Sequence, residues 1–399
     1  MSEWKKYRLR EFAERITSGG TPSTRKTEYF GGNIPWLRTQ EVNFNRIYET
    51  EIKITEKAVN NSSAKFIKAN SIIVAMYGAT AGRIAINKIP LTTNQACCNI
   101  TIDKNKADYN YVYYYLKSKF EEILKLATGA AQQNLNAGML RELEILAPDL
   151  PTQTQIASIL TTFDDKIELL GQMNQTLETM AQTIFKEWCC TKEDITPKNW
   201  TWKKLNDIAD VSSSKRIFRE EYTTNGIPFY RGKEITQLSN GESISTELYI
   251  SNERYFEIKE KFGIPKIGDI LVTSVGTIGS VWLVDNELPF YFKDGNVTWI
   301  KDYKTEANGA FVYQWVQSKE TKEQIKSVTI GSTQQALTIS ALKDLDILIP
   351  DRETVHKVCV QLENINAKKI SNLTQIHTLT QLRDTLLPKL MSGKIKIIC

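Results

Sequence analysis

The chain has 399 residues, of which 41% are hydrophobic, 24% charged and 10% aromatic. This length predicts two or three domains, and the composition is typical of packed globular protein, which excludes disordered, collagenous and small disulfide-stapled classes. Lys and Arg outnumber Asp and Glu by 51 to 46, and a net charge of +5 over this length selects no class of partner. The first residues show no apolar signal segment, and the longest apolar run, residues 72–77, is too short to span a membrane, so a cytoplasmic protein is expected.

Residues 1–150 predict a first α+β domain. Short apolar segments at 34–42, 71–76 and 97–102 are typical of strands, and residues 109–126 have the apolar spacing of a helix. A glycine-rich segment at 78–82 completes no phosphate-binding motif, and neither does its counterpart at 276–279. We therefore expect tight turns at both segments and no nucleotide site.

Residues 151–190 predict a long spacer helix. Between residues 156 and 188 the apolar positions follow a four-three rhythm over four heptads, which indicates a coiled-coil seam about 50 Å long. Asn174 falls at an a position, where a buried amide fixes the register of pairing. The alternative is an ordinary core helix packed on its own domain.

Residues 191–350 predict a second α+β domain because they repeat the first. Three blocks return in the same order at offsets of 193, 198 and 202: residues 33–42 as 226–235, residues 70–78 as 268–276, and residues 128–148 as 330–350. The two halves are therefore copies of one unit. The second copy predicts strands at 227–235, 270–274 and 296–301 and a helix at 309–327.

Residues 351–399 predict a second spacer helix, which should end near Pro388 because proline cannot continue a helix. Its apolar stripe needs a partner, and the first spacer helix is the obvious one. The expected fold class is α+β, with two tandem duplicated α+β domains separated by two long helices that form an antiparallel coiled coil. The residues expected to pair the helices are Leu160, Phe163, Ile167, Leu170, Asn174, Leu177 and Ile184 in the first and Leu362, Ile365, Leu373, Ile376 and Leu379 in the second.

Two similar domains held apart by a helical spacer are suited to duplex DNA, because half-sites on one face of the duplex recur about every 34 Å. Residues 57–102 contain five Lys or Arg and no acid, so the first domain favours phosphate. Residues 1–150 hold 21 basic and 15 acidic side chains, whereas residues 195–350 hold 19 and 20. Amides suit adenine edges and arginine suits guanine, although a solvated surface or a turn hydrogen bond is the alternative for each residue.

The candidate DNA-binding residues are polar or basic and lie mostly in expected loops. They are Thr21, Ser23, Arg25, Lys26, Arg38, Gln40, Lys65, Lys68, Arg83, Asn94, Gln95, Gln132 and Gln133 in the first domain and Lys215, Arg216, Arg219, Arg231, Lys233, Gln334 and Gln335 in the second.

Cysteine and histidine usage predicts neither a metal site nor a catalytic relay. The six cysteines, at 97–98, 189–190, 359 and 399, have no zinc-ligand spacing and are expected to be buried hydrophobic residues in a reducing compartment. His356 and His377 are the only histidines, and no nucleophile motif accompanies them.

Short motifs spread over the whole chain are weak singly and specific in combination. They are Ser18-Gly-Gly-Thr-Pro-Ser23, Ile34-Pro-Trp36, Gly78 to Gly82, Ala127-Thr-Gly129 with Gln132-Gln133, Leu143 to Pro148 with Gln155-Ile-Ala157, Phe163-Asp-Asp-Lys-Ile167, Thr183 to Trp188, and Leu387 to Lys394. With these motifs the sequence resembles the specificity subunit of a type I restriction-modification system.

The resemblance implies target-recognition domains at 1–150 and 191–350 that read a bipartite, asymmetric site in double-stranded DNA, with the helices at 151–190 and 351–399 as a molecular ruler. It also implies that the helices dock two modification subunits and, through them, restriction subunits. The chain itself would be non-catalytic and without a cofactor, because S-adenosylmethionine, ATP and Mg are expected on the partner subunits only.

The second copy departs from the family pattern, because Ser212 to Arg216 stand where the first copy has Gly-Gly-Thr-Pro. Such divergence is expected if each domain reads a different sequence. Two other interpretations remain open: an enzyme that methylates or cleaves DNA by itself, and a coiled-coil adaptor without a nucleic-acid role. No Asn-Pro-Pro-Tyr or Asp-Pro-Pro-Tyr methylation motif is found.

Overall fold

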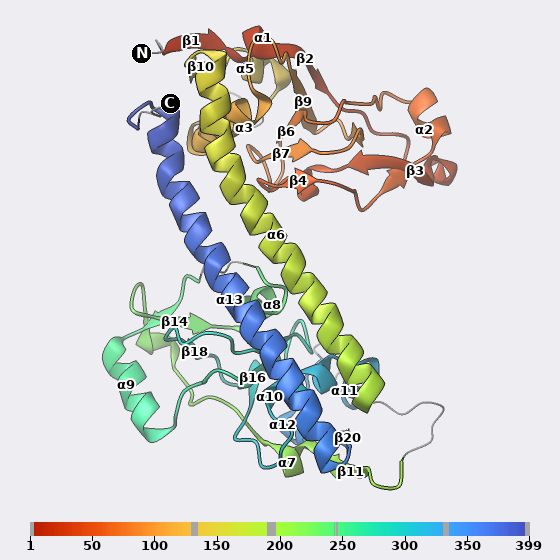
Figure 1. The fold of residues 1–399 in the computed structure, drawn as a ribbon, viewed down its shortest axis with the longest axis vertical. Coiled ribbons are helices and arrows are strands. Elements are labelled where there is room, and N and C mark those ends of the chain that lie inside the picture. The colour runs from red at the N-terminus through yellow and green to blue at the C-terminus, as the bar shows by residue number, and fades with distance from the viewer. Residues whose placement is uncertain are drawn as a thin grey trace. The chain divides into compact units, whose positions relative to one another are not determined.

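A computed structural model of the chain describes residues 4–128, 135–189, 197–242, 244, 246–329 and 335–395. The chain divides into two compact units, shown with their elements in Figure 1. Unit 1 comprises residues 1–168 and 376–399, and unit 2 comprises residues 169–375. Both boundaries fall inside long helices, so each of these helices contributes to both units.

Unit 1 is an α+β domain that is completed by parts of both long helices. Its elements are β1 (Lys5–Arg8), α1 (Leu9–Phe12), β2 (Ala13–Ser18), β3 (Phe30–Leu37), β4 (Arg46–Ile47), β5 (Lys53–Ile54), α2 (Glu56–Asn60), β6 (Ile72–Ala75), β7 (Ile84–Asn87), β8 (Thr92–Thr93), β9 (Cys97–Ile102), α3 (Tyr109–Ser118), α4 (Phe120–Thr128), α5 (Ala137–Arg141), β10 (Glu144–Ala147) and the start of α6 (Leu150–Cys189). The strands form a five-stranded sheet, β2-β9-β6-β7-β4, a three-stranded sheet, β5-β3-β8, and the pair β1-β10.

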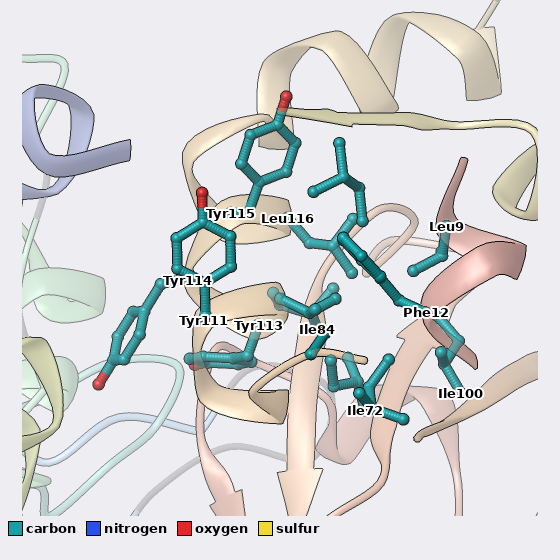
Figure 2. Close-up of a cluster of buried hydrophobic side chains, with 14 of the residues drawn as sticks. Leu9, Phe12, Ile72, Ile84, Ile100, Tyr111, Tyr113, Tyr114, Tyr115 and Leu116 are labelled. Atoms are coloured by element: carbon teal, nitrogen blue, oxygen red, sulfur yellow. The ribbon is translucent and has the colours of Figure 1, made fainter. Parts of the chain in front are cut away.

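The main core of unit 1 lies between the five-stranded sheet and α3. Alternate residues of each strand point to opposite faces, so Ile72 and Val74 face this core while Ile73 and Ala75 face a second, smaller core. Figure 2 shows the strand residue Ile84 beside the tyrosines of α3, and Ile100 beside Phe12 of α1. Tyr111 donates a hydrogen bond to the carbonyl of Leu146 on β10 (2.8 Å), which satisfies a hydroxyl that would otherwise be buried without a partner.

Unit 2 repeats this plan. Its elements are the end of α6, β11 (Thr201–Lys204), α7 (Leu205–Ile208), β12 (Asp210–Ser212), β13 (Tyr222–Thr223), β14 (Ile227–Tyr230), α8 (Gly232–Ser239), β15 (Tyr249–Ile250), α9 (Asn252–Lys261), β16 (Ile270–Thr273), β17 (Val281–Leu283), β18 (Tyr291–Phe292), β19 (Val297–Lys301), α10 (Gly309–Gln317), α11 (Lys319–Val328), α12 (Ile339–Lys343), β20 (Asp346–Ile349) and the start of α13 (Arg352–Met391). Its sheets are β12-β19-β16-β17, β13-β15-β14-β18 and β11-β20.

The predicted fold class is confirmed: two duplicated α+β domains are accompanied by two helices of 40 residues each. Within unit 2, Asn174 contacts Asn372 and Glu178 contacts Lys369. Residue numbers therefore rise along α6 as they fall along α13, so the two helices pair antiparallel.

Several predicted boundaries are wrong, for local reasons. The strand predicted at 227–235 ends at Tyr230, because the Glu234 carboxylate accepts a hydrogen bond from the Arg231 amide (2.8 Å) and caps the start of α8. The strand predicted at 34–42 likewise ends at Leu37 and is followed by a short 3-10 turn. The helix predicted at 309–327 is broken at Ser318, whose hydroxyl caps α11. The helix predicted at 109–126 is similarly divided, at Lys119.

Pro388 does not end the second long helix, which continues to Met391. Proline removes one backbone hydrogen bond, but Leu387, Leu390 and Met391 are buried in the main core of unit 1 and offset that loss. No helix among the described residues is long and apolar enough to cross a bilayer.

Candidate nucleic-acid interface

Four loops of unit 1 meet at one edge of its sheets. Strand ends coincide there because Ser18 pairs with Cys98 and Ala75 pairs with Cys97. The parallel strands β3 and β8 end level with each other, and the Asn94 amide donates to the Leu37 carbonyl (2.9 Å). We call this surface, residues 19–26, 38–41, 77–83 and 94–96, the loop edge of unit 1.

Gly20 brings a further segment to the loop edge of unit 1. A Cβ at this position would overlap the backbone of Ser63 and Ala64, so only glycine permits the close approach. The Gly20 carbonyl accepts a hydrogen bond from the indole of Trp36 (3.0 Å), which fixes the loop against β3. The segment that carries Lys65 therefore lies beside residues 19–26.

Most of the predicted residues of the first domain lie on this loop edge. Lys26 lies over the ring of Tyr29 (5.1 Å), whose hydroxyl also raises the pKa of this lysine. The exposed side chains are those of Ser23, Arg25, Lys26, Gln40, Lys65 and Gln95.

Four other predicted residues at this edge are less exposed. Arg38 pairs with Glu51 (2.6 Å), Arg83 donates to the Asn43 side chain (2.8 Å), and Thr21 donates to Gln95. The side-chain oxygen of Asn94 is buried without a hydrogen-bond partner. These contacts fix the loops and hold the guanidinium groups of Arg38 and Arg83 in a defined direction.

Lys68 does not reach the loop edge of unit 1. It pairs with Glu14 (2.6 Å) near the start of β2, whereas the loop edge lies beyond the end of that strand. The reason is that Lys68 lies four residues before the start of β6, whose opposite end forms the edge. Gln132 and Gln133 lie outside the described residues.

Unit 2 has an equivalent loop edge, residues 213–219, 231–234, 274–280, 293–296 and 335–337. Ser212 pairs with Trp299, and the parallel strands β14 and β18 end level at Tyr230 and Phe292. The Leu337 amide then donates to the Ser274 carbonyl (2.9 Å). The duplicated sequence therefore builds the same convergence of loops twice.

All described candidates of the second domain lie on this edge, with Lys215, Arg216, Arg219, Lys233 and Gln335 exposed. Arg216 pairs with Asp294 (2.7 Å), and Arg231 pairs with the buried Glu234 (2.8 Å). The ion pairs raise the pKa of both guanidinium groups, so they stay charged. Gln334 lies outside the described residues.

Exposed phenylalanines beside the basic residues were not predicted. Phe66, Phe218 and Phe262 are 49%, 59% and 47% exposed, and the Lys215 ammonium lies 5.0 Å from the Phe262 ring. Sequence reasoning missed them because phenylalanine is ordinarily buried. The available signal was the flanking Lys or Arg, since aromatic rings with cations can stack on or wedge between bases.

The predicted helix-pairing residues divide into buried and partly buried positions. Leu160, Leu170, Leu362 and Ile365 are buried, whereas Phe163, Ile167, Asn174, Leu177, Ile184, Leu373, Ile376 and Leu379 are partly buried. Trp188, the last residue of the predicted apolar stripe, is exposed.

Charged side chains also fix the helices to the first domain. Arg46 binds Asp165 and Glu168 of α6, and Arg383 of α13 binds Asp164. Burial lowers the pKa of both arginines, but their carboxylate partners outweigh that effect, so the net shift is upward. Both guanidinium groups therefore stay charged.

Among the described residues no three His, Cys, Asp or Glu gather as a metal site. Cys97, Cys98 and Cys359 are free and buried, and burial raises the pKa of Cys98 to about 12, so it is not a reactive thiolate.

Comparisons with known proteins agree on one family. A family model for the type I restriction modification DNA specificity domain matches residues 1–179 and 197–386. The chain is 33% identical over 99% of its length to the type I restriction enzyme MjaIX specificity subunit of Methanocaldococcus jannaschii, covering 94% of that protein. It is 22% identical, over 99% of its length, to the HindI specificity subunit of Haemophilus influenzae, all of which is covered.

A solved structure shows the same fold. The S subunit of a type I restriction-modification system from M. genitalium aligns with 100% of this chain and 97% of its own, with a TM-score of 0.61 and 19% identity.

Proposed function

Because the chain belongs to the type I restriction-modification DNA specificity family, we infer that it is the DNA specificity subunit of such a system. Each loop edge reads one part of a bipartite, asymmetric site in double-stranded DNA. The alternatives, an autonomous methyltransferase or nuclease and an adaptor without a DNA role, have no support from the relatives.

The observation that carries this assignment is the repeated loop edge. The same strand ends meet in both units, yet the side chains differ: Arg25 and Lys65 are exposed in unit 1, whereas Arg219 and Lys233 are exposed in unit 2. Phosphate contacts position a protein on DNA, and differing loop side chains read differing bases. Two unlike half-sites follow from this divergence.

The long helices serve as the docking surface for two modification subunits, through which restriction subunits join. Supporting this, large apolar side chains stand exposed along both helices: Leu169, Met180 and Trp188 on α6 and Val360 and Leu382 on α13. Met180 and Leu382 are at equivalent positions of the two copies, so both helices offer the same apolar contact to a partner subunit. S-adenosylmethionine, ATP and Mg belong to the partner subunits, and the chain itself catalyses nothing.

Methylation assays test the assignment. The purified chain should transfer no methyl group to DNA, and methylation should appear when the modification subunit from the same source is added. Mapping the methylated positions should give two fixed half-sites with a constant gap. Methyl transfer by the chain alone would establish the autonomous enzyme, and failure to bind any duplex at low salt would establish the adaptor.

Shortening the helices tests the ruler. Removing one turn from α6 and one from α13 should shorten the gap between the half-sites and leave their sequences unchanged. Changed half-sites would contradict the separation of roles between loop edges and helices.

A further inference from the structure

Within each unit, a carboxylate of α6 binds a cation of α13. In unit 1 Arg383 donates to Asp164 (2.6 Å), and the two side chains are 14% and 17% exposed. In unit 2 Lys369 pairs with Glu178, and these side chains are 21% and 24% exposed. The acid lies on α6 and the base on α13 in both cases.

Each of these carboxylates also accepts a hydrogen bond from its own domain. The Tyr114 hydroxyl of α3 donates to Asp164 (2.6 Å), and the Gln314 amide of α10 donates to Glu178 (3.4 Å). The negative charge at both positions is therefore held in place by at least two donors, so neither carboxylate can turn away to an alternative helix at no cost.

An amide pair lies one turn from Glu178. Asn372 is fully buried and donates to the Asn174 side chain (2.8 Å), and Asn174 donates to the Lys369 carbonyl (3.4 Å). The Asn372 side-chain oxygen, however, has no hydrogen-bond partner in the structure. A buried amide that lacks part of its hydrogen bonds lowers the stability of a helix pair. Its best-attested role is to determine which helices pair and in which register.

The sequence duplication shows that these contacts are not symmetric. The last repeated block recurs at an offset of 202, and this offset extends into the helices. It aligns Asn174 with Ile376 and Asn372 with Leu170. It also aligns the four charged residues with uncharged ones: Asp164 with Asn366, Glu178 with Thr380, Lys369 with Ile167 and Arg383 with Ala181.

We propose that these three polar contacts select the pairing of α6 with α13 and reject the pairing of two copies of either helix. In an α6–α6 pair built on the same register, Asp164 would face Ala181, Glu178 would face Ile167 and Asn174 would face Leu170. Every one of these groups would lose its partner, which is the usual form of selection against a wrong complex.

An α13–α13 pair would fail in the same way, because Arg383, Lys369 and Asn372 would face Asn366, Thr380 and Ile376. The net charges of the two helices also favour the α6–α13 pair. α6 carries five acidic and two basic residues, and α13 carries six basic and three acidic residues. Two copies of one helix repel, whereas α6 and α13 attract.

The selection matters because the two helices descend from one repeat and share an apolar pattern. The apolar stripe alone does not distinguish α6 from α13. The polar contacts supply the difference, and they do so independently of which DNA sequence the domains read.

A charge-exchange experiment on the full chain tests this selection. One variant carries D164K and E178K, so both of its helices present cations; the other carries K369E and R383E, so both present anions. Refolded separately, each should lose its helix pairing. Refolded together, they should form a 1:1 complex of twice the 45.5 kDa chain mass in sedimentation equilibrium, at least tenfold above the wild-type dimer fraction.

The matched control is K166E with K368E, which also reverses two charges but at exposed positions of the same helices. It should stay monomeric alone and should not associate with either variant. If the two charge variants remain separate when refolded together, or if the control associates as readily as they do, the proposal is wrong.

A second variant guards against a simple folding failure. N174I with N372L introduces the apolar residues found at the aligned positions, so the chain should fold at least as stably as wild type. Two differently tagged copies refolded together should then co-purify at least tenfold more than tagged wild-type copies. Co-purification at the wild-type level would overturn the role of the amide pair, whatever the DNA-binding result.

Discussion

Lys65 and Lys68 are three residues apart in the sequence but have different neighbours in unit 1. Lys65 adjoins the segment that Gly20 holds against the loop edge, whereas Lys68 pairs with Glu14 at the start of β2. Both are exposed, and both belong to the basic stretch that favours phosphate. We therefore predict that K65A weakens DNA binding and that K68A does not.

The size of the effect follows from counterion release. Each phosphate that a lysine neutralises contributes a slope of about 0.9 to the dependence of log affinity on log salt. Losing the Lys65 contact should thus lower the slope by about 0.9 and weaken binding roughly eightfold at about 0.1 M salt. K68A removes a charge of the same sign but no phosphate contact, so the slope should stay within error of wild type.

Fluorescence anisotropy measures both quantities. The duplex carries the site found by methylation mapping, and the salt concentration runs from about 50 to 200 mM. A scrambled duplex should show the same change for K65A, because phosphate contacts carry no sequence information. Equal losses for K65A and K68A would refute the location of the interface and would indicate only a long-range charge effect.

Four further outcomes are expected. R383A should lower the free energy of unfolding by about 3 kcal/mol, because the largely buried Asp164 carboxylate loses the cation that it pairs with. R352A removes an exposed ion pair and should lower the free energy of unfolding by less than about 1 kcal/mol in the same denaturant titration. L387A should cost about 2–5 kcal/mol and should increase hydrogen exchange in α3, although the two are far apart in sequence. F218A should weaken DNA binding without changing the salt slope, because a ring carries no charge. Burial, and next the charge of Arg383, lower the pKa of Lys117 below its ordinary value of 10.5, so the folded state disfavours the charged lysine. The free energy of unfolding should therefore rise as the pH increases from the lowered pKa to 10.5. The K117M variant should be more stable than wild type at pH 7, and its thermal melts should not show this rise.

The duplication and the long helices were predictable because they depend on local patterns. Heptad spacing needs only neighbouring residues, and the repeat needs only a comparison of the chain with itself. Boundaries were less predictable. Arg231 and Glu234 form a helix cap that turns the chain out of β14, and the apolar residues on either side of them carry no sign of it. Pro388 is tolerated because a distant core buries its neighbours.

The candidate site was only partly predictable because strand order decides which loops meet. The sequence around Lys68 does not show that this lysine lies at the end of β6 away from the loop edge. Its place follows from the way β6 pairs with β9. Similarly, the exposure of Phe218 depends on what packs around it, which the sequence does not encode locally. The type of each residue indicated which side chains suit DNA, but the sequence does not show at which end of a strand a residue lies.

Acidic residues among the basic ones explain why net charge was a poor guide to the interface. Glu51 orients Arg38, Asp294 orients Arg216, and Glu234 orients Arg231. Each pair cancels in a count of charges yet holds a guanidinium on a loop edge in a defined direction. An oriented guanidinium loses less conformational freedom when it meets a guanine edge or a phosphate, so part of the ordering cost is met during folding. A recognition domain of near-zero net charge can therefore bind DNA with defined geometry, provided that exposed residues such as Arg219 and Lys233 supply the attraction to phosphate.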